Sequence, residues 1–192
     1  MQLDGLKVAV LLTDGYEPSE LTEPMQALRD AGAIPTIISN HPGQITGKTD
    51  ADVATVDRTL DEVGAADFDA LLLPGGVRNP DTLRQDERAV RFVREAFDAG
   101  QPIAAICHAP WMLVEADVVR GRRVTSYPSL RTDLRNAGAE WMDEEVVTDR
   151  GLVTSRRPAD LPAFNAKMVE EFAEGRHERR AGAGSSAGAA VS

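Results

Sequence analysis

Short apolar runs that alternate with helical stretches are the feature that most constrains the fold of this chain. The runs cover residues 7–12, 34–39, 70–73 and 103–107, and their hydrophobicity is continuous rather than alternating. Continuous hydrophobicity is typical of strands that helices cover on both faces, as in a parallel sheet. Strands that alternate with helices favour right-handed βαβ units. The sequence therefore predicts an α/β protein with a doubly wound, mostly parallel sheet.

The stretches between the apolar runs supply the helices. Residues 19–31 and 81–99 have helical spacing of apolar side chains, and each ends before a glycine that can close a helix in the left-handed conformation. Residues 161–174 predict the closing helix. Two stretches, 45–56 and 145–155, instead predict hairpins, the first of them beside the main sheet.

The length and composition suit one domain followed by a tail. A chain of 192 residues is long enough for one well-buried core and short for two. Residues 176–192 are rich in arginine and then in alanine, glycine and serine. Such a segment buries little surface, so we predict one domain over 1–175 and a disordered tail over 176–192.

The charge and the cysteine content limit the partners and the compartment. The formal net charge of −10 disfavours nucleic acid and anionic membranes, because both require clusters of Lys and Arg. A single cysteine forms no disulfide within the chain and suits a reducing compartment. No signal peptide and no apolar run of bilayer length is found. We therefore expect a cytoplasmic protein with no nucleic-acid or membrane partner.

Polar residues follow three of the predicted strands directly, in segments 13–17, 74–76 and 107–108. In an open α/β sheet, ligands bind at the carboxyl ends of the strands. We therefore expect these segments to converge on one site. The chain lacks the short cysteine and histidine spacings of metal motifs, a dinucleotide fingerprint and a phosphate loop, so neither a metal nor a cofactor is expected.

Cys107 is the candidate nucleophile of this site. It stands where a strand runs into a helix, and small residues, Ala105 and Ala109, flank it. This is the layout of a nucleophile elbow. The helix that follows is expected to lower the thiol pKa. The alternative is a small cysteine buried in the core.

Three further residues are candidates for supporting roles. The N–H groups of Gly76 and His108 would form an oxyanion hole, although a double glycine also suits a plain turn. Glu17 would place a protonated carboxyl beside the thiol. Alternatively, it is only an acidic residue at a helix N-terminus, where the helix dipole favours a negative charge. His108 could act as a base, but adjacency in sequence does not establish contact with the sulfur of Cys107.

The sequence resembles the PfpI/ThiJ family of the class I glutamine-amidotransferase-like superfamily, and in particular its intracellular protease I branch. The resemblance covers nearly the whole chain except the tail. The matching stretches are DALLLPGG (69–76), AAICHAPW (104–111), RGRRVTSY (120–127), NAGAEW (136–141), EEVV (144–147), LVTSR (152–156) and DLPAF (160–164).

This resemblance implies a flavodoxin-like, three-layer fold and roles for individual residues. Cys107 would be the nucleophile, Glu17 its acidic partner, and the N–H groups of Gly76 and His108 the oxyanion hole. His108 would join a triad that is completed by a carboxylate of a neighbouring subunit, for which Asp81 is the match. Family members form dimers or larger oligomers, so a homodimer or higher homo-oligomer is implied.

The function expected from these observations is that of a stress-related, cysteine-dependent hydrolase without a cofactor. Its substrate would be either a peptide or a small reactive aldehyde of the methylglyoxal type, free or attached to protein, as for a deglycase or glyoxalase. The alternative from another class is a non-catalytic redox sensor or chaperone-like stress protein that uses the same cysteine. Isonitrile hydration, which occurs in a sister branch, is a further alternative.

Overall fold

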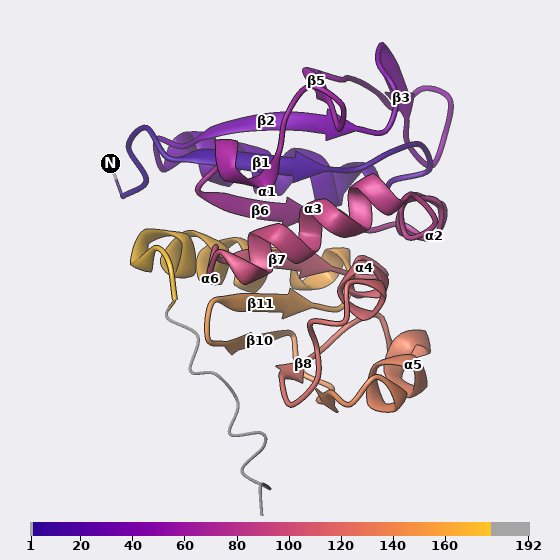
Figure 1. The fold of residues 1–192 in the computed structure, drawn as a ribbon, viewed down its shortest axis with the longest axis vertical. Helices are drawn as coiled ribbons and strands as arrows, with labels where there is room; N and C mark the ends of the chain where they lie inside the picture. The colour runs from indigo at the N-terminus through magenta and orange to yellow at the C-terminus, as the bar shows by residue number, and fades with distance from the viewer. Residues whose placement is uncertain (1, 178–192) are drawn as a thin grey trace, which may run out of the picture.

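The computed structural model of the chain describes residues 2–177, which fold around one seven-stranded sheet (Figure 1). All neighbouring strands of this sheet are parallel except β10, which pairs antiparallel with β11. The predicted mostly parallel α/β sheet is therefore confirmed. In spatial order the strands are β10 (Val146–Asp149), β11 (Leu152–Ser155), β7 (Ile103–Ile106), β6 (Ala70–Leu73), β1 (Lys7–Leu11), β2 (Ile34–Ser39) and β5 (Arg58–Thr59).

Helices cover both faces of the sheet and give three layers (Figure 1). Along β1, Ala9 and Leu11 pack into the core beneath α3 and α4, whereas Val8 and Val10 pack into the core beneath α1 and α6. All of these strand residues are buried, which explains why the run is apolar without alternation. The helices are α1 (Pro18–Asp30), α2 (Arg78–Leu83), α3 (Glu87–Asp98), α4 (Pro110–Glu115), α5 (Arg131–Asn136) and α6 (Leu161–Glu174).

Both predicted hairpins are confirmed, but they differ in their placement. The first, β3 (Gln44–Thr46) with β4 (Val53–Thr55), forms a separate two-stranded sheet. The second, β10 with β11, instead extends the main sheet, because β11 pairs in parallel with β7. A further small sheet joins β8 (Arg123–Val124) to β9 (Glu140–Trp141), and three short 3₁₀ turns cover Ala65–Asp67, Pro128–Leu130 and Pro158–Asp160.

The single helix predicted over 81–99 is wrong, since the structure divides this segment into α2 and α3. Asp86 lies between them with an extended backbone, and its side chain accepts a hydrogen bond from the backbone N–H of Arg88. An aspartate in this position satisfies one of the free N–H groups at a helix start. The cap at Asp86 therefore begins a new helix where the apolar spacing alone had predicted continuity.

We expect Asp86→Ala to lower the free energy of unfolding by about 1 kcal/mol, the usual loss for an N-cap. The Asp86 carboxylate also accepts a hydrogen bond from Arg88 Nη2 at 2.7 Å. The bonds to Arg88 lower the pKa of the Asp86 carboxyl. The loss should therefore shrink as the pH falls through this lowered pKa. Urea unfolding measures it, with Asp98→Ala as the control, because Asp98 is an exposed side chain at the end of α3. Equal losses in both variants would contradict the capping role.

The predicted tail over 176–192 lies outside the described residues from position 178 onward. Arg176 and His177 are described, and the backbone N–H of His177 donates to the carbonyl of Gly100 at 2.9 Å. These two residues therefore lie against the folded body rather than in a disordered tail. None of the helices between residues 2 and 177 combines the length and hydrophobicity of a bilayer span.

Candidate active site

The carboxyl ends of β1, β6 and β7 open into one cavity of about 580 Å³. Residues of all three segments singled out from the sequence line it: Tyr16 and Glu17 from the first, Gly76 from the second, and Cys107 with His108 from the third. The structure thus brings these segments together. The cavity lies where an open α/β sheet usually binds its ligand.

Asn79 holds two of these loops together, although the sequence reasoning did not single it out. Its side chain is buried and accepts from the backbone N–H of Thr13 at 2.8 Å. Its amide donates to the carbonyls of Pro74 and Gly75, both at 3.0 Å. The loop after β1 and the loop after β6 are therefore fixed relative to each other by one side chain.

Cys107 lies at a sharp turn directly after β7. Its φ of +65° is in the left-handed region, which costs a residue other than glycine on the order of 1–3 kcal/mol. The backbone is held there from both sides: Cys107 N–H donates to Ser155 at 3.1 Å, and Tyr127 N–H donates to the Cys107 carbonyl at 2.8 Å. The elbow expected from the sequence is present, and the side chain lines the cavity with 7% exposure.

The carboxyl beside Cys107 belongs to Glu20 rather than to Glu17. Glu20 is fully buried and hydrogen-bonds to the Cys107 thiol, and its Oε2 also accepts from Gly76 N–H at 3.2 Å. Glu17 instead stands at the start of α1, with its carboxylate 3.5 Å from Lys48 Nζ. The assignment of Glu17 as the acidic partner is therefore corrected to Glu20, one turn further along the helix.

Burial controls the protonation of this pair. It raises the pKa of Glu20 to about 7, and the nearby charge of Glu17 acts in the same direction. Burial, followed by the charge of Glu20, raises the pKa of the Cys107 thiol to about 12, although the N–H groups of Gly76 and His108 oppose this rise. The expectation of a lowered thiol pKa is thus wrong for this structure. The N-terminal end of the six-residue helix α4 favours the thiolate, but desolvation and the carboxylate of Glu20 have the larger effect on the thiol pKa.

Two backbone N–H groups face the sulfur, as the sequence reasoning expected. Both Gly76 and His108 donate from the main chain toward Cys107. Gly76 has φ +83°, and a Cβ at this position would lie 2.5 Å from the Gly15 carbonyl oxygen. Only glycine allows this approach, which directs the N–H into the cavity. A negative charge that develops next to the sulfur would therefore meet two fixed donors.

We expect Gly76→Ala to destabilise the protein by about 2 kcal/mol or more, from its left-handed backbone and its contact with Gly15. Urea unfolding measures the loss. Gly64→Ala is the matched control, because a Cβ there would meet no atom within 4 Å and the position has a negative φ. Similar stability of the two variants would show that the loop after β6 can adapt.

His108 contacts the sulfur, which sequence adjacency could not establish. Its Nδ1 lies 3.1 Å from Cys107 Sγ, and its Nε2 lies 3.3 Å from Ser129 Oγ. The ring stacks on Tyr127, with centroids 4.7 Å apart, and its edge meets Trp111. Burial lowers the pKa of His108, so the imidazole is neutral near pH 7.

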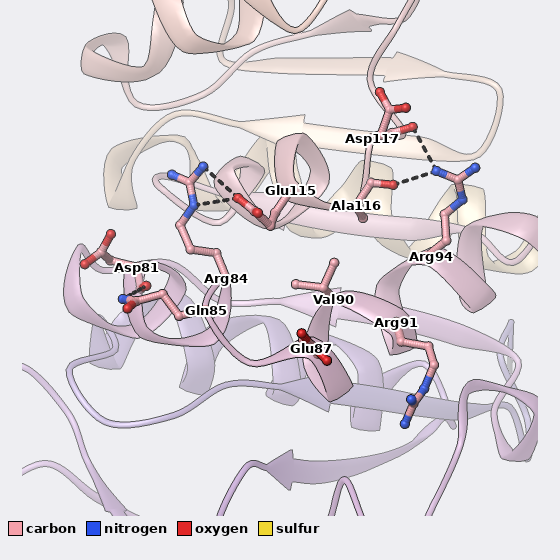
Figure 2. A pocket seen from close by; sticks show the side chains of 10 residues that line it. All are labelled: Asp81, Arg84, Gln85, Glu87, Val90, Arg91, Arg94, Glu115, Ala116 and Asp117. Carbon is pink, nitrogen blue, oxygen red and sulfur yellow. Dashed lines mark hydrogen bonds and ion pairs between the residues drawn. The ribbon is translucent and has the colours of Figure 1, made fainter.

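Asp81 lies outside the Cys107 cavity of its own chain. It lines a second hollow of about 850 Å³ over α2, α3 and α4. Figure 2 shows its carboxylate apart from the Arg84–Glu115 pair, whose Nη2 and Oε2 atoms are 3.1 Å apart. The structure therefore joins Glu20, Cys107 and His108 within one chain but does not bring Asp81 to them.

The layers, the strand order and the elbow together define a flavodoxin-like protein with a cysteine at the end of a central strand. The chain belongs to the DJ-1/PfpI family, whose model matches residues 6–171. "Protein/nucleic acid deglycase 2" of Escherichia coli is 50% identical over 165 residues, which cover 85% of this chain and 95% of that protein. "General stress protein 18" of Bacillus subtilis is 47% identical over 167 residues, which cover 86% of this chain and 96% of that protein. The crystal structure of Drosophila melanogaster DJ-1beta is 32% identical, with a TM-score of 0.81 over 88% of this chain and 91% of that one.

Proposed function

We propose that this protein is a cysteine-dependent hydrolase of reactive aldehydes of the methylglyoxal type, free or attached to protein. The observation that carries the proposal is the pair formed by the Cys107 thiol and the buried Glu20 carboxyl, whose pKa is about 7. A carboxyl that titrates near neutral pH can take a proton from the thiol and return it within one turnover. The name of the Escherichia coli relative, a deglycase, supports the same substrate class.

The first step adds sulfur to the aldehyde carbon. As the carbon–sulfur bond forms, the thiol proton moves to the Glu20 carboxylate and the carbonyl electron pair moves to oxygen. The N–H groups of Gly76 and His108 hold that oxygen, which then receives the proton from Glu20 to give a hemithioacetal. His108 Nδ1, at 3.1 Å from Sγ, orients the sulfur.

The second stage releases the product as an acid. Transfer of the hydrogen on the former aldehyde carbon to the neighbouring keto carbon converts the hemithioacetal into a thioester. Water then cleaves the thioester, which frees the Cys107 thiol and gives a 2-hydroxy acid, lactate in the case of methylglyoxal. A cavity of about 580 Å³ has room both for methylglyoxal and for an aldehyde attached to a protein side chain.

We further propose that the protein works in the cytoplasm as a homodimer or higher homo-oligomer. The absence of a cysteine pair suits a reducing compartment. In the oligomer, Asp81 of one subunit would approach His108 of another. It is free to do so, because it lies on the exposed side of α2. The neutral His108 would gain a carboxylate partner that residues 2–177 of its own chain do not supply.

The experiment offers the purified chain three substrates: methylglyoxal, a methylglyoxal-modified peptide and an unfolded protein, each with Cys107→Ala as the blank. We expect lactate from the first two, and no lactate from the blank. Cleavage of the unfolded protein alone would replace the proposal by a peptidase. No turnover at all, together with selective oxidation of Cys107 by mild peroxide, would favour the redox sensor instead.

A further inference from the structure

A histidine and two glutamates meet at the end of α6, far from the cavity. Glu171 and Glu174 lie on the last turn of the helix, and His177 follows after the chain reverses at Gly175. One ligand atom from each lies within 4.8 Å of the others. These residues are close to Gly100 and Gly151, which precede β7 and β11, whereas Cys107 follows β7. The cluster therefore sits at the opposite edge of the sheet from Cys107.

The spacing in this cluster is wider than that of hydrogen bonds and suits one shared ion. His177 Nε2 lies 3.5 Å from Glu171 Oε2 and 3.9 Å from Glu174 Oε2. Good N–H···O hydrogen bonds are about 2.7–3.2 Å long. Two ligands each about 2.0–2.2 Å from a tetrahedral ion lie roughly 3.3–3.6 Å apart. Only small movements would bring the three atoms around a single metal.

The Nε2 atom of His177 is itself buried, within a side chain that is 26% exposed, and it has no hydrogen-bond partner in the described part of the chain. A buried nitrogen of this kind costs free energy unless something satisfies it. The Nε2 lone pair of a neutral imidazole is the usual metal ligand of histidine. The atom without a partner is therefore the one that would bind the ion.

The surrounding backbone holds these side chains in place. His177 N–H donates to the Gly100 carbonyl at 2.9 Å, and the imidazole packs on Gly151, where a Cβ would lie 2.5 Å from His177 Cδ2. Glu171 is 7% exposed, and its carboxylate accepts from Gly151 N–H. Hydrogen bonds that orient a carboxylate in this way are typical around metal ligands.

The charges in this cluster also favour a cation. The two carboxylates together carry the charge that one divalent ion balances. Mg²⁺ and Ca²⁺ prefer oxygen ligands alone, so the imidazole nitrogen makes them a poor fit. It favours transition metals of the Zn²⁺ class instead.

We propose that Glu171, Glu174 and His177 bind one divalent transition-metal ion, with Zn²⁺ as the type, and so fasten the segment after α6 to the body of the protein. Two of the three ligands lie beyond residue 171, where the match to the DJ-1/PfpI family ends. The site lies at the opposite edge of the sheet from Cys107 and takes no part in the chemistry there.

Zn²⁺ titrated calorimetrically into the chelator-stripped full chain tests the proposal, with Cys107→Ala as the parent so that the thiol binds no metal. We expect one equivalent to bind. His177→Ala and Glu171→Gln should each lower the association constant at least ~10-fold, since even the partners of metal ligands contribute that much. His41→Ala is the matched control and should leave binding unchanged, because among the described residues His41 pairs with a single carboxylate, that of Asp14.

Co²⁺ supplies a second readout that does not depend on stability. Bound to one imidazole and two carboxylates, it should show visible absorption of a low-symmetry site, which His177→Ala removes while the circular dichroism of the fold stays the same. No binding of either ion would overturn the proposal. Binding that survives in both the His177→Ala and Glu171→Gln variants would overturn it equally.

Discussion

Cys107→Ala is expected to lower kcat for methylglyoxal by at least ~10³-fold, the largest effect of any single change in this protein. The chemistry has one nucleophile, and no other cysteine exists in the sequence to replace it. Lactate formation under saturating substrate measures the loss.

The same variant should unfold at nearly the wild-type temperature. Alanine keeps both the left-handed backbone at position 107 and most of the burial, so it neither relieves strain nor opens a large cavity. A loss of activity with unchanged stability would assign the effect to the sulfur. Residual turnover within ten-fold of wild type would show that Cys107 is not the nucleophile.

Glu20→Gln is expected to give the second largest loss, about 10²- to 10⁴-fold in kcat/KM, which is the usual contribution of a general base. The wild-type pH profile should rise through about 7, the pKa of Glu20, because the ionised carboxylate accepts the thiol proton. Glutamine accepts no proton, so this limb of the profile should disappear in the variant.

Glu17→Gln is the control for this prediction, since Glu17 lines the same cavity but its carboxylate contacts Lys48. Its maximal activity should stay close to that of wild type, while the rise should move to lower pH, because the charge of Glu17 no longer raises the pKa of Glu20. If instead Glu17→Gln removed the rise near pH 7 and Glu20→Gln did not, the assignment of the base would be reversed.

Stability supplies an independent check on Glu20. Its pKa is raised in the folded state, so the protonated carboxyl stabilises the fold at acidic pH, and this stabilisation is lost as the pH rises through about 7. Glutamine does not ionise. The difference in unfolding free energy between Glu20→Gln and wild type should therefore shift in favour of the variant as the pH rises from 4.5 to about 7, and stay constant above that.

The central strands could be predicted because burial on both faces leaves an uninterrupted apolar run, as in β1 and β7. The place of β10 and β11 in the main sheet could not be predicted, because their pairing with β7 joins segments distant in the sequence. The division between α2 and α3 depends on one side chain, that of Asp86. Local spacing predicts elements well, but it does not predict their partners.

Within the site, Gly76, Cys107 and His108 could be found because each follows a strand directly. Glu20 could not be found by that rule, since it lies one turn inside α1, where an acid is expected from the helix dipole alone. A signal existed nevertheless: Glu20 shares the four-residue spacing of Pro24 and Leu28 on the buried face of the helix. A carboxylate on an apolar stripe indicates a functional role more strongly than one at the helix start.

The thiol pKa was predicted in the wrong direction for a physical reason. The sequence shows that a helix follows Cys107, but it does not show how deeply the sulfur is buried or that Glu20 is beside it. Desolvation and a neighbouring negative charge are properties of the packed structure, and together they exceed the field of a short helix.

The double use of the Gly76 N–H couples the two halves of the first chemical step. In the resting protein this donor is engaged by Glu20 Oε2 at 3.2 Å and also faces the sulfur. Once Glu20 has gained a proton, its oxygen becomes a poorer acceptor, and the amide is released to the substrate at the moment when charge accumulates there. In the proposed mechanism, removal of the thiol proton would therefore free the Gly76 N–H for the intermediate, and the two events would be coupled.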